Sequence, residues 1–311
     1  AVLYHSSMLL SLTDPFRLAE GEVGLLFDIL MQHADSCRII PGNSWSGSGD
    51  GLFLVDLHSA APPVPCTRLD PPVDVRESYL LDATLALAAI RERLAQTPAK
   101  VRMQSPEAMV LRRLLPEVSG AERRREQRRA DGRWVKLLLG LGNIHGWLLH
   151  AANKAPENRR PPELAPCKVL DASDSGMKLA WEAGGPGDAR VGDLLGIVEG
   201  EGQQQSLRLA LIRSIRIYRE GGMEAGVQLM HGGLGAVSCL VPDEADSVAV
   251  RALFLPASES EQLAATLITA KGLYTEGCGL LVDVGGREIR VRAGRRVFDS
   301  PVFDRFEFSA E

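Results

Sequence analysis

The chain lacks the features that would assign it to a membrane, secreted or zinc-binding class. Its 311 residues contain no apolar run of the roughly 18–20 residues that a membrane-spanning helix requires. No Lys or Arg precedes the short apolar stretch in residues 1–12, so we expect no secretory signal there. The five cysteines are far apart and form no CxxC pair, which argues against a disulfide framework and a multi-cysteine zinc site. We therefore expect reduced thiols in a cytoplasmic protein without a metal or a membrane span.

An excess of positive charge is also missing. The chain has 35 Lys and Arg against 40 Asp and Glu, a formal net charge of −5. Proteins that coat nucleic acid usually show a basic domain, so we expect no nucleic acid polymer as a partner. Hydrophobic residues at 45% and charged residues at 24% are ordinary for a globular protein and argue against disorder or a fibre. The chain begins with Ala1 rather than Met, and whether it is a fragment is left open.

The first part of the chain mixes helical and strand patterns. Apolar spacing predicts a helix over Gly21–His33 and an amphipathic helix over Arg76–Gln96, whereas Leu52–Leu57 is typical of a strand. Ser105 followed by Pro106 is the start signal of a further helix, with Ser105 as its N-cap. These patterns predict an N-terminal α/β domain over residues 1–119.

Strand patterns dominate the rest of the chain. Trp134–Leu139 is typical of a strand and Asn143–Ala152 of a short helix. Further strands are expected at Cys167–Leu170, Met177–Trp181, Leu194–Glu199, Leu207–Tyr218 and Glu224–Leu229, with glycine-rich turns between them. Many short strands with such turns favour a barrel or a sandwich.

A smaller β-rich segment follows Pro242. Strands are expected at Leu263–Ile268, Gly279–Val284 and Arg287–Val291. Gly285-Gly286 lies between the last two and is typical of a two-residue hairpin turn. We predict a small C-terminal β-rich domain over residues 243–311.

A run of arginines stands out against the acidic average. It contains Arg123, Arg124, Arg125, Arg128 and Arg129. The ordinary interpretation is a solvated helix end with a favourable dipole interaction. Because every cation in the run is Arg and none is Lys, a second interpretation gains weight. Guanidinium forks bind phosphate or the O6/N7 edge of guanine with two donors, and they stack on bases.

A second candidate is the segment Asp171-Ala172-Ser173-Asp174-Ser175-Gly176. Its ordinary interpretation is a turn between two strands. The functional interpretation is a loop that presents a carboxylate and a hydroxyl group to a ligand. Asp171 can accept hydrogen bonds from the N–H donors of a guanine Watson–Crick edge, and Ser173 can donate to a base or phosphate oxygen.

Together the two segments resemble the ligand motif of the PilZ family of cyclic di-GMP receptors. The motif pairs RxxxR, here Arg124 with Arg128 or Arg125 with Arg129, with DxSxxG at Asp171, Ser173 and Gly176. The later segments Val191–Leu194, Leu211–Arg213 and Glu224–Leu229 are similar to later strands of a PilZ barrel. The resemblance covers residues 122–242, less than half of the chain. It implies a PilZ-like antiparallel β-barrel over 120–242, with a helical insert at about 140–166.

The resemblance implies a mostly β, α+β protein in which an N-terminal α/β segment and a C-terminal β-rich segment flank the barrel. It implies a bacterial, non-enzymatic second-messenger receptor that needs no cofactor or metal. The implied ligand-binding residues are Arg124, Arg125, Arg128, Arg129, Asp171, Ser173 and Gly176. Binding of cyclic di-GMP would reorient the domains and so reach a protein partner that the sequence does not identify.

The chain departs from the family pattern between the two motifs. The stretch from Arg129 to Asp171 is longer than in a minimal PilZ domain, which leaves the register of the arginines open. Ala130 stands where the family often carries an apolar or Pro residue that starts the first strand. Arg159 and Arg160, closer to the loop, are second-choice ligands.

Two other functions stay open. The long insert favours a degenerate PilZ-like barrel that acts as a protein-interaction module without nucleotide. A hydrolase or transferase using Asp171, Asp174 or His145 is the other, although no nucleophile–base set is visible in the sequence. His145 and His150 do not share one helical face, which argues against a zinc pair. Titration with cyclic di-GMP separates the module from a receptor, and turnover of nucleotide would reveal an enzyme.

Overall fold

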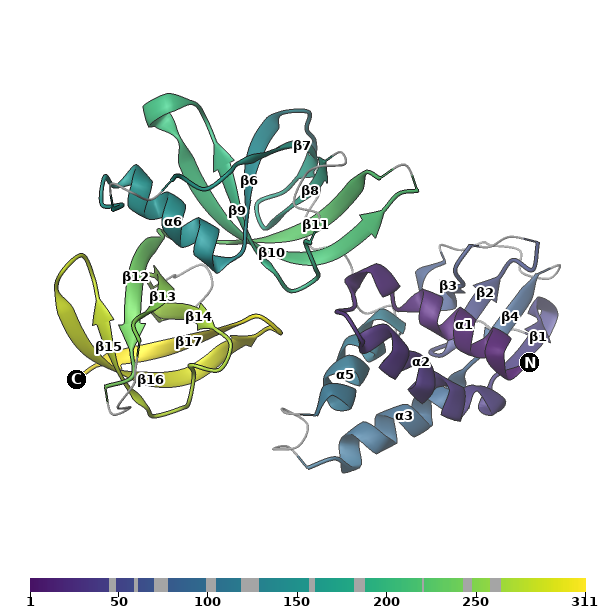
Figure 1. Ribbon diagram of the computed structural model, residues 1–311. Helices are drawn as coiled ribbons and strands as arrows, with labels where there is room; N and C mark the ends of the chain where they lie inside the picture. Colours follow the sequence, from purple (N-terminus) through teal and green to yellow (C-terminus); the bar gives the residue numbers. More distant parts are fainter. Residues whose placement is uncertain are drawn as a thin grey trace. The chain divides into compact units, whose positions relative to one another are not determined.

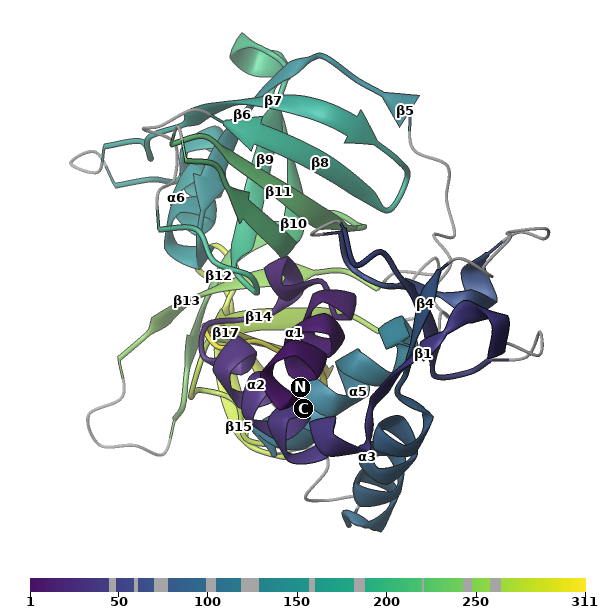
Figure 2. The same ribbon diagram turned by 90° about the vertical axis from the view of Figure 1, so that its right-hand side faces the viewer.

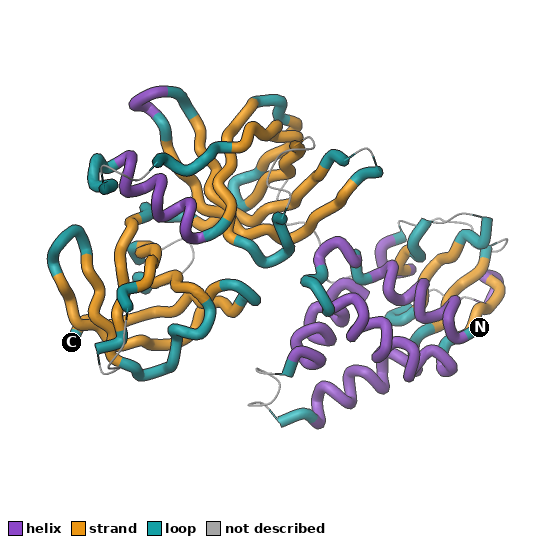
Figure 3. The backbone as a smooth tube through the Cα atoms, viewed as in Figure 1, coloured by secondary structure: helices purple, strands orange, loops and turns teal. Residues whose placement is uncertain are grey.

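A computed structural model describes most of the chain. The described residues are 1–44, 49–58, 61–69, 78–98, 105–118, 129–156, 160–181, 188–219, 221–242, 248–257 and 264–311. The chain divides into two compact units, Ala1–Arg125 and Glu126–Glu311. Helices dominate the first unit and strands the second (Figure 3). No helix within the described residues is long and apolar enough to cross a membrane.

The first unit packs helices against a small antiparallel sheet. Its helices are α1 (Val2–Leu12), α2 (Glu22–His33), α3 (Thr84–Gln96) and α5 (Pro106–Val118), with short 3-10 turns at Pro15–Arg17, Ala34–Ser36, Gly42–Ser44 and Cys66–Arg68. Its strands are β1 (Arg38–Pro41), β2 (Leu52–Val55), β3 (Val64–Pro65) and β4 (Tyr79–Asp82), in the order β1-β4-β2-β3. The predicted N-terminal α/β segment is therefore confirmed.

One element of this unit differs from the prediction. The helix expected over Arg76–Gln96 begins only at Thr84, because Tyr79–Asp82 forms the strand β4 between β1 and β2. Leu80 and Leu81 are fully buried there. A short apolar run that is covered on both faces has no period of its own, so its pairing partners decide between strand and helix.

The first part of the second unit is an antiparallel barrel. It comprises β5 (Arg129–Ala130), β6 (Trp134–Leu139), α6 (Leu141–Ala151), β7 (Ala165–Ala172), β8 (Gly176–Trp181), β9 (Leu194–Glu199), the 3-10 turn Gly202–Gln204, β10 (Ser206–Ile217) and β11 (Met223–Met230). The strand order is β5-β7-β6-β9-β10-β11-β8, and β8 also pairs with β7, which closes the ring (Figure 1). The predicted barrel is confirmed, and α6 begins two residues before the helix that was expected over Asn143–Ala152.

A second closed barrel forms the end of the chain. Its strands are β12 (Gly235–Leu240), β13 (Val250–Leu255), β14 (Thr266–Ala270), β15 (Gly279–Asp283), β16 (Glu288–Asp299) and β17 (Phe303–Ala310). Gly285 and Gly286 both have positive φ, +66° and +92°, as a type I′ hairpin turn requires. The predicted boundary at residue 242 falls after β12, which pairs with β13 and β15, so the second barrel begins earlier than that boundary.

The helix α6 joins the two barrels into one body. Ile144 is fully buried in an apolar cluster that takes residues from both barrels: Leu138, Leu194, Val198, Leu209 and Leu211 from the first, and Leu253, Leu255, Ile268 and Phe303 from the second. The buried His145 ring donates through Nε2 to the carbonyl oxygen of Val237 in β12, at 3.0 Å. The structure therefore gives His145 a packing role at the junction between the barrels.

Candidate ligand-binding site

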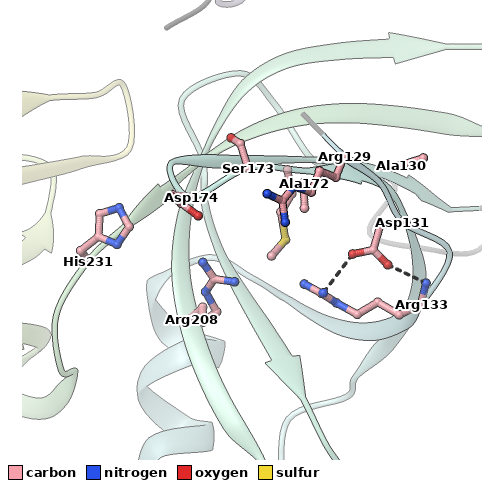
Figure 4. Close-up of a pocket in the computed structure, with 10 residues that line it drawn as sticks. Arg129, Ala130, Asp131, Arg133, Ala172, Ser173, Asp174, Arg208 and His231 are labelled. Carbon is pink, nitrogen blue, oxygen red and sulfur yellow. Dashed lines mark hydrogen bonds and ion pairs between the residues drawn. The ribbon is translucent and has the colours of Figure 1, made fainter. Parts of the chain in front are cut away.

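A cavity of about 710 Å³ lies at the β5 end of the first barrel. Its lining residues are Arg129, Ala130, Asp131, Arg133, Ala172, Ser173, Asp174, Met177, Arg208 and His231 (Figure 4). The volume is within the range of about 300–1,000 Å³ that small-molecule sites occupy. Three arginines and only two carboxylates line it, so the cavity suits an anionic ligand.

An interrupted strand brings Arg129, the last residue of the arginine run, to this cavity. Strand β5 pairs with the last residues of β7, Arg129 opposite Ala172, and lies beside that end of β7 in Figure 2. Strand β6 pairs with the earlier residues of β7, beginning with Trp134. Between them, the backbone N–H of Asp131 still donates to the carbonyl of Leu170, at 3.0 Å. β5 and β6 thus follow one edge of β7, and the residues at their break line the cavity.

Two carboxylates hold Arg133 at the cavity rim. Asp131 Oδ1 accepts the backbone N–H groups of Gly132 at 2.7 Å and Arg133 at 3.0 Å, and its Oδ2 pairs with Arg133 Nη1 at 2.9 Å. The hydrogen bond from the Arg133 backbone N–H lowers the pKa of Asp131. The Gly132 N–H and the positive charge of the Arg133 guanidinium group act in the same direction. Arg133 Nη2 also donates to Glu199 Oε1 at 3.1 Å, which Arg208 approaches at 3.8 Å.

The predicted loop is held by its own backbone. The N–H of Ser173 donates to the carbonyl of Gly176 at 2.8 Å, and Ser173 Oγ donates to the same oxygen at 3.3 Å. The carbonyl of Ser175 accepts the N–H of Leu229 in β11 at 2.8 Å. The backbone of the loop is thereby fixed to a neighbouring strand as well as to itself.

The structure brings part of the predicted site together. Arg129 and Ser173 both line the cavity. Asp171 lies on β7 opposite Ala130 of β5 and is not among the lining residues, while the buried Gly176 begins β8. The predicted Arg124, Arg125 and Arg128 lie outside the described residues, as does Arg159. Arg160 is exposed before β7 and does not line the cavity.

Several lining residues were not predicted from the sequence. Asp131 and Arg133 lie just after the arginine run. The Asp131-Gly132 pair is a turn signal that could have predicted the break between β5 and β6. Arg208 and His231 come from β10 and from the position after β11, and no short motif connects them to the loop. The described part of the chain holds no cluster of three or more metal-ligating side chains.

The second unit of the chain is similar to known proteins. Residues 149–232 match the model described as "Cyclic-di-GMP receptor FimW, middle PilZ domain", and residues 236–310 match the "FimW C-terminal beta-barrel domain". The first match contains the Asp171–Gly176 loop but begins after the arginine run. The chain is also similar to the cyclic-di-GMP receptor FimW of Pseudomonas aeruginosa, with 31% identity over 146 residues. That alignment covers 46% of this chain and 24% of the relative.

Proposed function

Because the chain contains a PilZ domain, we propose that it is a cytoplasmic receptor for cyclic di-GMP that acts by binding rather than by catalysis. One observation carries the proposal: Arg129, from the arginine run, and Ser173, from the distant loop, line the same cavity. The similarity to a cyclic-di-GMP receptor supports the same ligand. The mixed lining of arginines and carboxylates suits a ligand that has both phosphates and guanine bases.

Arg129 favours one register of the RxxxR motif. It lies opposite Ala172, one residue before Ser173, so its guanidinium group and the loop can contact one ligand. We propose that Arg125 and Arg129 form the motif pair and that their forks hold a phosphate or a guanine edge. In this arrangement Asp171 and Ser173 bind a guanine, and Gly176 lets the backbone approach it.

Calorimetric titration with cyclic di-GMP tests the function directly. Saturable heat with cyclic di-GMP, and much weaker binding of cyclic di-AMP, is the expected result. The absence of binding at any ligand concentration would favour the degenerate interaction module. Release of a linear dinucleotide or of mononucleotides during the same incubation would instead reveal an enzyme.

Asp171→Ala tests which group reads the guanine. The substitution removes an acceptor for guanine N1–H and N2–H₂, and unpaired polar edges of a base are costly. We expect weaker binding of cyclic di-GMP and a narrower preference over cyclic di-AMP, both measured by calorimetry. An equal loss for the two nucleotides would mean that Asp171 supports the β5–β7 pairing rather than contacting a base.

The arginine run also suggests a route from binding to signalling. The division between the two compact units falls within this run, after Arg125. Since Arg125 and Arg129 stand on either side of this division in the sequence, a ligand that binds both would act on the segment that joins the two units. We propose that binding changes the orientation of the N-terminal unit, and that a protein partner recognises the new arrangement. A ligand can do this only through its differential affinity for the two arrangements.

Limited trypsin digestion measures this coupling. The phosphates of cyclic di-GMP offset the repulsion among the clustered arginines and would tie the run to the Asp171–Gly176 loop. We expect cleavage between Arg123 and Arg133 to fall as ligand is added, following the binding curve. Cleavage that stays the same at saturating ligand would exclude this route, and cleavage after Lys154, an exposed residue that does not line the cavity, serves as the internal control.

A further inference from the structure

One side of the cavity is formed by residues that neither motif requires. Figure 4 shows Asp174, Arg208 and His231 on the side away from Asp131 and Arg133. They come from the β7–β8 loop, from β10, and from the residue that follows β11. Three elements far apart in the sequence therefore converge on a second edge of the same cavity.

The chemistry of this edge matches a guanine base. The exposed carboxylate of Asp174 makes no hydrogen bond or ion pair with the residues that the structure describes. Arg208 has a long contact of 3.8 Å with Glu199, which leaves most of its five N–H donors for another partner. A carboxylate accepts the guanine N1–H and N2–H₂ groups, and a guanidinium fork donates to O6 and N7. His231 adds an aromatic ring on which a base can stack.

The symmetry of the proposed ligand explains why a second edge is needed. Cyclic di-GMP has two identical halves, each with one guanine and one phosphate. A cavity that recognised only one guanine, at the Asp171–Gly176 loop, would bind any cyclic dinucleotide that has guanine in one half, whatever the base in the other half. Asp174 with Arg208 brings a carboxylate and a guanidinium group to this edge, the same pair of groups that the proposed motif residues Asp171 and Arg129 would offer to the first guanine.

We propose that Asp174 and Arg208 bind the second guanine of cyclic di-GMP, with His231 closing this edge of the cavity. The proposal rests on the function proposed above and adds the residues that set specificity for the second half of the ligand. Since His231 lies directly between β11 and β12, the second base would also contact the connection between the two barrels.

The test compares cyclic di-GMP with cyclic GMP–AMP, which keeps one guanine and replaces the other with adenine. Calorimetry measures both affinities for the full chain and for Arg208→Lys and Asp174→Asn. Each variant keeps the size of the side chain but removes the fork or the charge. We expect about a ten-fold loss for cyclic di-GMP and no loss for cyclic GMP–AMP. Matched controls are Arg213→Lys on the same strand and Asp188→Asn, neither of which lines the cavity.

The outcomes separate this proposal from the function itself. A chain that binds neither nucleotide overturns the receptor function. A chain that binds cyclic di-GMP with equal losses for both nucleotides in the two variants overturns only the second-guanine edge, because the residues would then act as general electrostatic or structural groups. Unchanged affinity in both variants overturns it as well.

Discussion

Arg129→Ala is expected to weaken cyclic di-GMP binding by roughly 10- to 100-fold, because hydrogen bonds to charged groups contribute about 1.5–3 kcal/mol each. Arg129 is the described member of the arginine run, and it extends into the group of side chains that surrounds the cavity (Figure 4). Arg129 begins β5, and the pairing of β5 with β7 fixes its backbone. The side chain can thus meet a ligand phosphate without ordering the main chain first.

A graded series distinguishes the fork from the charge. Arg129→Lys keeps the charge but loses the planar, two-donor geometry, so we expect an affinity between those of the wild type and the Ala variant. Calorimetry at fixed ionic strength gives the three values, since electrostatic binding depends on salt. Arg160→Ala is the control, because Arg160 is exposed and does not line the cavity. A larger loss at Arg160 than at Arg129 would instead support the second-choice arginines.

Ile144→Ala is expected to lower the free energy of unfolding by about 2–5 kcal/mol, the usual cost of truncating a buried Ile to Ala. Ile144 is fully buried in the cluster that both barrels share, which includes Leu194 of the first barrel and Phe303 of the second. The loss should therefore destabilise the two barrels together. Urea denaturation measures the free energy, and hydrogen exchange shows which strands lose protection.

The matched control for this substitution is Val248→Ala, at a side chain that is 77% exposed in the same unit. Exposed substitutions of this kind usually change stability by less than about 0.5 kcal/mol. We expect faster exchange in β13 and β14 of the second barrel as well as in β9. Wild-type protection in β13 and β14 would contradict the view that α6 couples the two barrels.

The sequence predicted those parts of the fold that are determined by residues close together in the chain. The strand Leu194–Glu199 has the predicted bounds, and the glycine pair at 285 and 286 forms the expected turn, because neighbouring residues decide both. The segment 79–82 was assigned to a helix because its apolar run contains no information about β1 and β2 on either side. The burial of His145 against Val237 likewise depends on a contact between residues far apart in the chain.

The same difference between local and long-range determinants applies to the residues of the candidate site. Arg129 and Ser173 were predicted because they belong to short motifs, and the structure places both at one cavity. Arg208 and His231 lie in or after strands whose patterns are otherwise ordinary. Only the order of the strands around the barrel brings them beside the loop, and strand order is not encoded in any one segment. Residues of this kind can be assigned to the site only once the arrangement of the strands around the barrel is known.

The closure of both barrels limits how a partner can bind. In the part of the chain that the structure describes, each ring of strands pairs its own backbone, so neither barrel offers a long open edge to which a foreign strand could be added. The open edges of the N-terminal sheet are β1 and β3, which are short and end at Pro41 and Pro65. Proline and short length are devices that protect edge strands from such pairing. A protein partner of the kind proposed above would therefore have to be recognised through side chains, and charge substitutions on the outer surfaces would test for it.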